Sequence, residues 1–227
     1  MLAYHNNPKI KQEILQQLQY SDYNISIDDI DDIETRLGIP RVLVYLQDAI
    51  FDELPTKVAI DWSIRFMSAI PVGANLSGIW REFAVWLLID PIDGVIQYTT
   101  PGTEAYEVII KVANLYQHGH TTQQMTDAAY DAAYAFDAAN AAAAANAFDA
   151  ADFTVSYAVS YAVSAAYNAA AVRAAAAVVY AACAVAVVNT YYDATDARDV
   201  EYIKMSNKLI ELLENLDKTR TENASLP

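Results

Sequence analysis

Glycine and proline are nearly missing from the second half of the chain. All six glycines, and every proline except Pro227, lie before residue 121. These two residues interrupt regular structure more strongly than any others, and alanine is the best intrinsic helix former. The alanine-rich stretch that begins at Thr121 therefore predicts nearly continuous helix, with helices packed closely because their side chains are short.

Cysteine and long apolar runs are also scarce. The single cysteine, Cys183, excludes a disulfide within the chain and fits a reducing cytoplasm. The first residues lack the apolar core of a secretory signal. The longest uncharged apolar run, residues 174–188, is shorter than the ~20 residues that span a bilayer. We therefore expect a cytoplasmic protein with no membrane span.

Basic residues are outnumbered two to one by acidic ones. The chain has 14 Lys and Arg against 29 Asp and Glu, which gives a formal net charge of −15 and a pI near 4.3. A field of this sign repels nucleic acid and anionic membranes and favours basic partners. We expect no direct binding of nucleic acid and instead a basic protein partner, because an acidic protein can occupy a groove that normally holds nucleic acid.

Catalytic motifs are absent from the sequence. There is no Gly-rich phosphate loop, no HExxH and no GxSxG. His118 and His120 straddle a glycine but lack the third protein ligand that a catalytic zinc needs, so solvated loop histidines are favoured and metal binding by the pair stays open. Cys183 has no basic neighbour to activate it. We predict a protein that is not an enzyme and has no catalytic residues, no metal site and no cofactor.

Helical periodicity and capping signals recur through residues 1–120. Asn7-Pro8 can open a first helix, and Ser26 with Asp29 can cap a second that ends at Gly38. Further helices are expected at about 42–54, 57–70, 78–89 and 103–117. The helix at 78–89 is apolar almost all round, which predicts a central position in the N-terminal half. The composition of residues 90–94 predicts a turn, and residues 95–98 could form a short extended piece.

The C-terminal half has its own pattern. Thr121 with Gln124 matches a capping box, residues 155–164 repeat the order Val-Ser-Tyr-Ala, and Asp196 with Asp199 can open a last helix. A single rod over this half would leave its apolar face unburied, so helix pairs are preferred. We predict an all-α protein with a mixed helical domain at 1–120, followed by a tightly packed antiparallel Ala-rich bundle at 121–227.

An acidic run forms the outward face of the second predicted helix. It lacks the mid-loop glycine and the ligand spacing of a calcium-binding EF-hand loop, while its isoleucines keep helical period. A solvated helix face is therefore the simplest interpretation, and it is also our candidate docking surface for a basic partner. The surface consists of Asp28, Asp29, Asp31, Asp32 and Glu34.

Two other functions stay open. A cleft lined by tyrosines could bind a nucleotide or metabolite, with Arg173 holding an anion, although a structural ion pair of Arg173 with Asp149 or Asp152 is favoured. The residues of this alternative site are Arg173, Tyr157, Tyr161, Tyr130 and Tyr134. Alternatively, exposed Ala and Tyr faces could pair between chains in a structural homo-oligomer.

Five segments carry a resemblance to a known family. They are LGIP at 37–40, LQDAIF at 46–51, RFMSAIPVG at 65–73, FAVWLLIDP at 83–91 and KLIELL at 208–213. On these segments the chain resembles an uncharacterised family found in bacterial, prophage and phage genomes, and its Ala-rich region is loosely similar to immunity proteins. The resemblance implies a phage or mobile-element setting, and with it a counter-defence inhibitor or immunity-type protein. The relatives' Gly/Cys/His-rich segment is replaced here by the acidic run, so no metal or redox role carries over.

Overall fold

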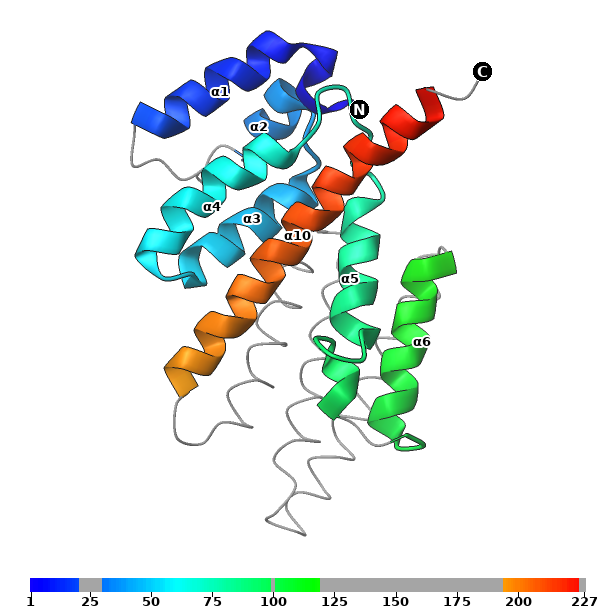
Figure 1. Ribbon diagram of the computed structural model, residues 1–227. Coiled ribbons are helices and arrows are strands. Elements are labelled where there is room, and N and C mark those ends of the chain that lie inside the picture. The colour runs from blue at the N-terminus through cyan, green and yellow to red at the C-terminus, as the bar shows by residue number, and fades with distance from the viewer. Residues whose placement is uncertain (21–29, 99–100, 119–193, 225–227) are drawn as a thin grey trace. The chain divides into compact units, whose positions relative to one another are not determined.

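The computed structural model confirms the all-α prediction (Figure 1). It describes residues 1–20, 30–98, 101–118 and 194–224, and these contain helices and no strand. The α-helices are α1 (Pro8–Tyr20), α2 (Ile30–Leu37), α3 (Arg41–Glu53), α4 (Thr56–Ala69), α5 (Ile79–Ile89), α6 (Glu104–His118) and α10 (Ala194–Ala224). Two short 3₁₀ elements, η1 (Ala3–Asn6) and η3 (Val95–Tyr98), complete the described residues.

Three helix ends lie where the sequence places them, whereas Asp196, the expected start of the last helix, lies inside α10. Asn7 caps α1, since its Oδ1 accepts the amide of Lys9 at 3.0 Å, and Thr103 Oγ1 accepts the amide of Tyr106 at 3.4 Å at the start of α6. Gly38 ends α2 in the left-handed region, with φ of 65°, and its amide bonds to the Glu34 carbonyl.

One predicted element is wrong. Residues Val95–Tyr98 form the 3₁₀ helix η3, whereas the sequence predicted an extended piece. The Gly94 carbonyl accepts both the Gln97 amide, at 3.3 Å, and the Gln97 side-chain Nε2, at 3.1 Å. These local bonds close a turn and leave no extended backbone.

The chain divides into two compact units that do not follow chain order. The first unit consists of Met1–Trp80 together with Tyr202–Pro227, and the second unit of Arg81–Glu201. The larger part of α10 therefore belongs with the N-terminal helices, although the sequence grouped it with the Ala-rich bundle. The bundle itself and the predicted domain boundary at residue 120 stay predictions, because residues 119–193 lie outside the described part of the chain.

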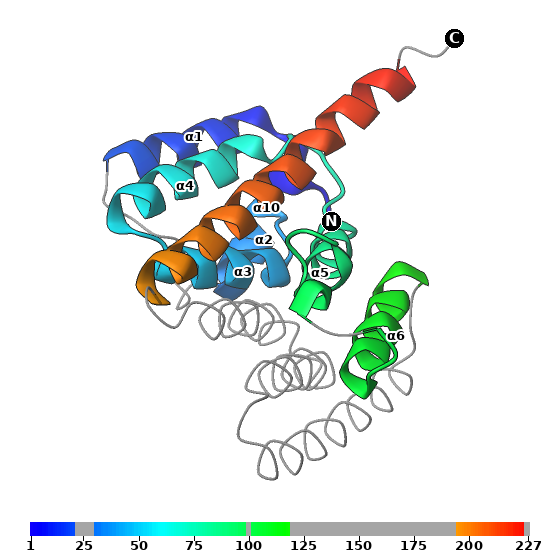
Figure 2. The ribbon, with the colours of Figure 1, turned by 60° about the horizontal axis from the view of Figure 1, so that its bottom comes forward.

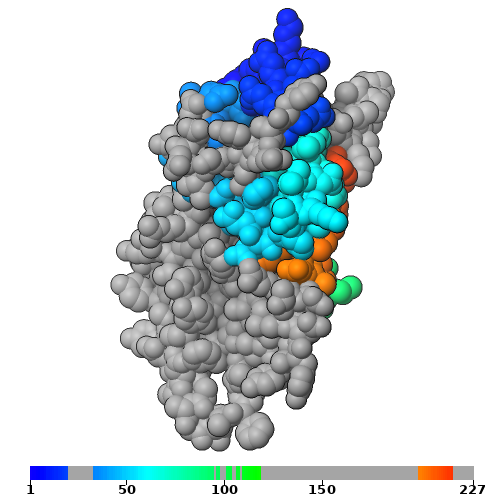
Figure 3. Space-filling view, turned by 90° about the vertical axis from the view of Figure 1, so that its left-hand side faces the viewer, coloured from blue at the N-terminus to red at the C-terminus, as the bar shows by residue number. Residues whose placement is uncertain are grey.

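The core of the first unit is built from α2, α3, α4 and α10. Helix α3 packs against both α4 and α2, and α4 packs against α1. Figures 1 and 2 show α10 running across α4 and α3, and Arg65 of α4 donates a hydrogen bond of 3.3 Å to Asn207 of α10. In Figure 3 the surface of α4, in cyan, lies between α1, in blue, and α10, in orange. Large fully buried side chains include Leu43, Leu46, Ile50, Trp62, Phe66, Met67 and Tyr202.

The second unit contains α6 and the part of α5 from Arg81 onward, and each helix has one buried stripe. In α5, Phe83 and Leu87 are buried while Arg81 and Glu82 are exposed, so this helix is amphipathic rather than buried all round. Trp86 is partly exposed and lies against Phe83, with ring centroids 5.5 Å apart. The stripe of α6 consists of Ile109, Val112, Ala113 and Tyr116.

The N-terminal element η1 has a left-handed backbone. The φ angles of Tyr4, His5 and Asn6 are 52°, 49° and 57°, in the left-handed region that residues other than glycine rarely adopt. Nothing in the sequence indicated this turn. It is fixed in place by backbone hydrogen bonds from Ala3 to Ala74 and from Gly73 to Ala3, at 2.9 and 2.8 Å.

Candidate functional site

Helix α2 carries the described part of the acidic docking surface. Ile33 and Leu37 are 6% and 4% exposed, so the predicted apolar stripe is confirmed at these two positions. The helix contacts α3 and η1. On the η1 side, His5 Nε2 donates a hydrogen bond of 2.8 Å to the carbonyl of Thr35. Packing on two neighbours therefore fixes α2 in the first unit.

Glu34 has a partner that the sequence did not indicate. The Nε of Arg41, the first residue of α3, donates a hydrogen bond of 2.8 Å to Glu34 Oε2, and both side chains are substantially exposed. The LGIP turn between the two helices brings these residues together. An exposed pair of this kind contributes at most about 1 kcal/mol to stability. It does, however, offset part of the negative charge of the docking surface.

The role of the other four carboxylates in the docking surface stays a prediction. Asp31 and Asp32 lie within α2, whereas Asp28 and Asp29 lie outside the described residues. The residues of the alternative ligand site also lie outside the described part of the chain. They are Arg173, Tyr157, Tyr161, Tyr130 and Tyr134.

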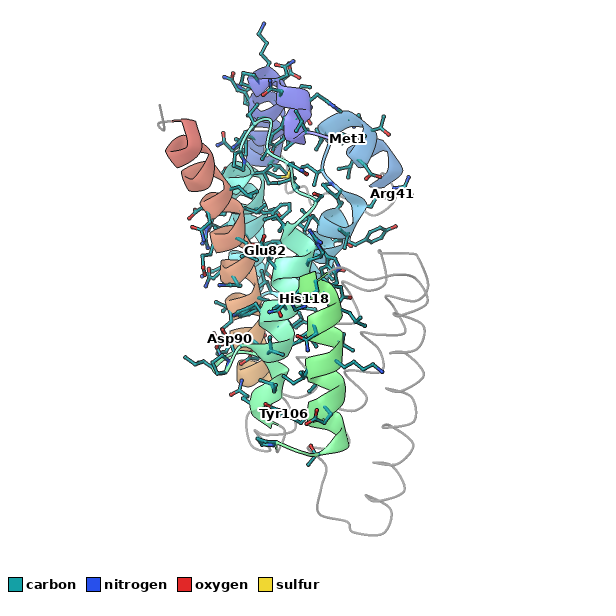
Figure 4. The ribbon with its side chains drawn as sticks, turned by 90° about the vertical axis from the view of Figure 1, so that its right-hand side faces the viewer. Met1, Arg41, Glu82, Asp90, Tyr106 and His118 are labelled. Atoms are coloured by element: carbon teal, nitrogen blue, oxygen red, sulfur yellow. The ribbon has the colours of Figure 1, made fainter. Side chains whose placement is uncertain are left out.

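Histidine gives no metal site among the residues that the structure describes. His118 is the last residue of α6 (Figure 4), and its Nδ1 donates a hydrogen bond of 3.0 Å to the carbonyl of Asn114 in the same helix. His120 lies outside the described residues. Within ranges 1–20, 30–98, 101–118 and 194–224, no group of three or more His, Cys, Asp or Glu could hold a metal ion.

A tight loop follows α5, at the position where the sequence predicted a turn (Figure 4). Asp90 organises it: one carboxylate oxygen accepts the amides of Ile92 and Asp93, both at 2.9 Å, and its carbonyl accepts the amide of Gly94 at 2.9 Å. A Cβ at Gly94 would clash with the backbone of Asp90, so only glycine fits. The loop leaves the Ile92 side chain 74% exposed.

The core of the first unit contains buried polar groups. Gln47 of α3 donates a hydrogen bond of 3.2 Å to Ser63 of α4, and both residues are almost fully buried. Trp62, also fully buried, stacks on Phe66 with ring centroids 5.4 Å apart. Its indole Nε1 has no hydrogen-bond partner among the described residues. The hydrogen bond of Gln47 joins α3 to α4, and α3 also carries a buried carboxylate, Asp48, which is 5% exposed.

Tyr4 is a described group with a clearly shifted pKa. Its ring is fully buried, its hydroxyl donates a hydrogen bond of 2.7 Å to the carbonyl of Met67, and the Lys11 ammonium lies 5.8 Å from the ring centroid. Burial raises the pKa of the Tyr4 phenol well above its ordinary value, because the phenolate would lose its hydration. The group therefore stays neutral and serves packing.

Comparisons with protein-family models, with curated proteins and with solved structures found no match. The resemblance to the phage-associated family accordingly stays a prediction. Among the residues that the structure describes, no helix is long and apolar enough to cross a membrane.

Proposed function

We propose that this chain is a non-enzymatic acidic binding protein that docks on a basic site of a nuclease or defence complex. The proposal includes a phage or mobile-element setting, as an inhibitor or an immunity-type protein, in keeping with the family resemblance. The observation that carries it is the formal net charge of −15. A charge of that size steers encounters with basic surfaces and opposes binding to nucleic acid.

Helix α2 is the proposed centre of contact. The burial of Ile33 and Leu37 holds the helix on the first unit, which supports its use as a firm acidic surface. Because Arg41 already pairs with Glu34, the remaining carboxylates of the run matter most for a partner. These are Asp28, Asp29, Asp31 and Asp32.

The test is binding as a function of salt. Tagged protein is incubated with host lysate at about 50 mM and about 500 mM salt, since exposed charge pairs are screened at the higher concentration. A retained basic protein is then purified and its Kd measured across the same range. We expect the fourfold variant with Asn at positions 28, 29, 31 and 32 to bind about tenfold to a hundredfold more weakly at low salt, and its Kd to depend less on salt.

A matched control removes the same formal charge elsewhere. Asp52, Asp61, Glu107 and Glu214 are exposed, and their replacement by Asn or Gln also removes four negative charges. We expect this control to weaken binding much less. Equal weakening by both variants would show that net charge alone acts and would remove α2 from the proposal. Failure of the native protein to retain any basic protein at low salt would overturn the proposed function.

A further inference from the structure

The first residues of the chain dock on the first unit as a separate segment. Residues 1–6 precede α1 and lie against the turns that follow α2 and α4. The Ala3 amide donates a hydrogen bond of 2.9 Å to the Ala74 carbonyl, and the Ala3 carbonyl accepts the Gly73 amide at 2.8 Å. A peptide that docks on another chain is often held by backbone bonds of this kind.

Tyr4 seats this segment in the first unit. Its side chain is fully buried, and its hydroxyl donates a hydrogen bond of 2.7 Å to the Met67 carbonyl. Next to the segment, Gly38 has no room for a side chain, because a Cβ would clash with the Leu2 carbonyl. A buried aromatic side chain with a hydrogen-bonded polar end is a common anchor of protein interfaces. The receptor surface for the segment consists of Gly38, Met67, Gly73 and Ala74.

A strained turn connects the segment to α1. Tyr4, His5 and Asn6 have positive φ, and their left-handed backbone returns the segment to the receptor surface of its own chain. Residues other than glycine disfavour this conformation, which persists only where surrounding contacts impose it. When a second copy supplies the segment, the turn at His5 and Asn6 opens while Ala3 and Tyr4 keep their contacts. The strain therefore disfavours the closed chain relative to two chains that exchange segments.

Two local hydrogen bonds and the charge of the chain oppose this exchange. The His5 amide donates to the Leu2 carbonyl at 2.9 Å, and the Asn7 amide to the Tyr4 carbonyl at 2.8 Å. Opening the turn replaces these bonds by bonds to water, because residues 5–7 are exposed, so the net loss is small. The formal net charge of −15 makes two copies repel each other, and salt screens this repulsion.

Exposed apolar side chains on the segment favour pairing of two copies. Met1 is 75% exposed and Leu2 is 47% exposed. In a pair that exchanges segments, both side chains lie at the junction between the copies. Removal of their apolar surface from water would stabilise that junction.

We propose that two copies of this chain form a dimer by exchanging residues 1–4, with His5 and Asn6 as the hinge. The Tyr4 side chain of each copy then fills the receptor surface of the other, so neither surface is complete without the partner copy. All of these residues belong to the first unit. The inference is independent of the proposed basic partner.

Sedimentation of the full chain tests the dimer and its hinge. Concentrations from about 1 µM to about 500 µM are compared at about 50 mM and about 500 mM salt, because salt weakens the repulsion between copies. We expect a dimer whose Kd falls as salt is raised. Asn6→Gly removes strain and should raise the dimer Kd about tenfold, whereas Asn6→Val adds strain and should lower it about tenfold. Asn114→Val, at an exposed position within α6, is the control and should leave the dimer Kd unchanged.

Isotope labelling detects the exchange itself. Chains with and without heavy nitrogen, each carrying a benzophenone side chain at position 2, are unfolded, mixed, refolded and illuminated. Because Leu2 adjoins Gly38, the crosslinks should join position 2 to the turn after α2. In exchanged dimers, about half of the crosslinked peptides should combine a labelled with an unlabelled partner. A closed chain, or a dimer without exchange, gives no mixed crosslink at this turn.

Three results would overturn the proposal. They are a native chain that stays monomeric at every concentration and salt, a dimer without mixed crosslinks, and a shift of the dimer Kd in the same direction by Asn6→Gly and Asn6→Val. Because the Asn6 side chain is exposed, both variants should keep the circular dichroism spectrum of the native protein. A change in Kd then reports the hinge and not a loss of folding.

Discussion

At the scale of single residues, Tyr4 links the N-terminal turn to the core. Its hydroxyl donates to the carbonyl of Met67, close to the C-terminal end of α4, and its ring lies near Lys11. Lys11 in turn donates to the carbonyls of Ser68 and Ile70, at 2.6 and 2.8 Å. A cation at a helix C-terminus is favoured by the helix dipole. Tyr4 and Lys11 together donate hydrogen bonds to carbonyls at the end of α4 that have no next helical turn to bond to.

The raised pKa of Tyr4 predicts a loss of stability in alkali. The folded protein holds the phenol proton above pH 10, the ordinary pKa, while the unfolded chain releases it. The stability that Tyr4 contributes is therefore fully present below about pH 10 and falls by about 1.4 kcal/mol per pH unit above it. We expect Tyr4→Phe to lose about 1 kcal/mol at pH 7, through the missing hydrogen bond, and to show a smaller alkaline loss.

Urea unfolding between pH 7 and pH 11 measures this effect. Tyr45→Phe, at a partly exposed tyrosine of α3, is the control for removal of a hydroxyl and should keep the alkaline loss of the native protein. Parallel pH profiles for Tyr4→Phe and the native protein would contradict the role assigned to Tyr4.

At the scale of elements, the left-handed turn depends on two glycines that lie far from it in the sequence. Gly38 and Gly73 both have positive φ, of 65° and 75°. A Cβ at Gly38 would clash with the backbone carbonyl of Leu2, and one at Gly73 would clash with the side chain of Asn6. The turns after α2 and α4 therefore leave the space that the N-terminal segment fills.

The two glycines should tolerate alanine unequally. Both Gly38→Ala and Gly73→Ala incur a left-handed backbone cost of about 1–2 kcal/mol. At Gly73 the obstacle is the end of a side chain that can rotate away, whereas at Gly38 it is fixed backbone. We expect Gly38→Ala to reduce the free energy of unfolding by clearly more than Gly73→Ala, measured by chemical denaturation. Equal losses would mean that backbone strain alone acts and that the Leu2 contact is easily displaced.

Sequence patterns predicted most helix limits and missed the turn. Asn7-Pro8, Gly38 and Thr103 carry their signals in adjacent residues, because caps and breaks depend on local backbone geometry. The turn at residues 4–6 depends on hydrogen bonds to Gly73 and Ala74, which no local pattern can reveal. Residues 95–98 were mistaken for an extended piece because their side chains suit either state, and the bonds to Gly94 decide between them.

The candidate site was predictable only in part. The helical period of Ile33 and Leu37 correctly placed α2 against a core. The pairing of Glu34 with Arg41 was not foreseen, because it depends on how α3 leaves the LGIP turn. The exposure of Ile92 was missed for a similar reason: turn composition indicates where the chain reverses but not which side chain is left in solvent.

At the scale of the whole molecule, the first unit is closed by a helix from the other end of the chain. Tyr202, Met205, Leu209 and Leu213 of α10 are all buried, although the sequence suggested a separate C-terminal bundle. The sequence predicted a last helix here, with Leu209 and Leu213 among its apolar positions. Periodicity identifies a buried face but not its partner, which explains why the association of α10 with the N-terminal helices was not predicted.

This association predicts that α10 and the N-terminal helices lose stability together. Leu209→Ala should lower the free energy of unfolding by about 2–5 kcal/mol, because the side chain is fully buried. Native-state hydrogen exchange should show the same decrease in protection in α3, α4 and the buried part of α10, as expected of one cooperative unit. Glu214→Ala, at an exposed position of α10, is the control and should leave protection nearly unchanged. Loss of protection confined to α10 would contradict a shared core.

The two parts of the first unit are synthesised at different times, because residues 81–201 lie between them in the sequence. Helices α1 to α4 leave the ribosome first, but α10 follows only after residues 81–201 have been made. At about 5–20 residues per second, translation of the intervening segment takes roughly 6 to 24 s. During that interval the nascent helices lack the side chains of Tyr202, Met205 and Leu209 that complete their core. The newborn chain is then open to chaperone capture or aggregation until α10 has been made.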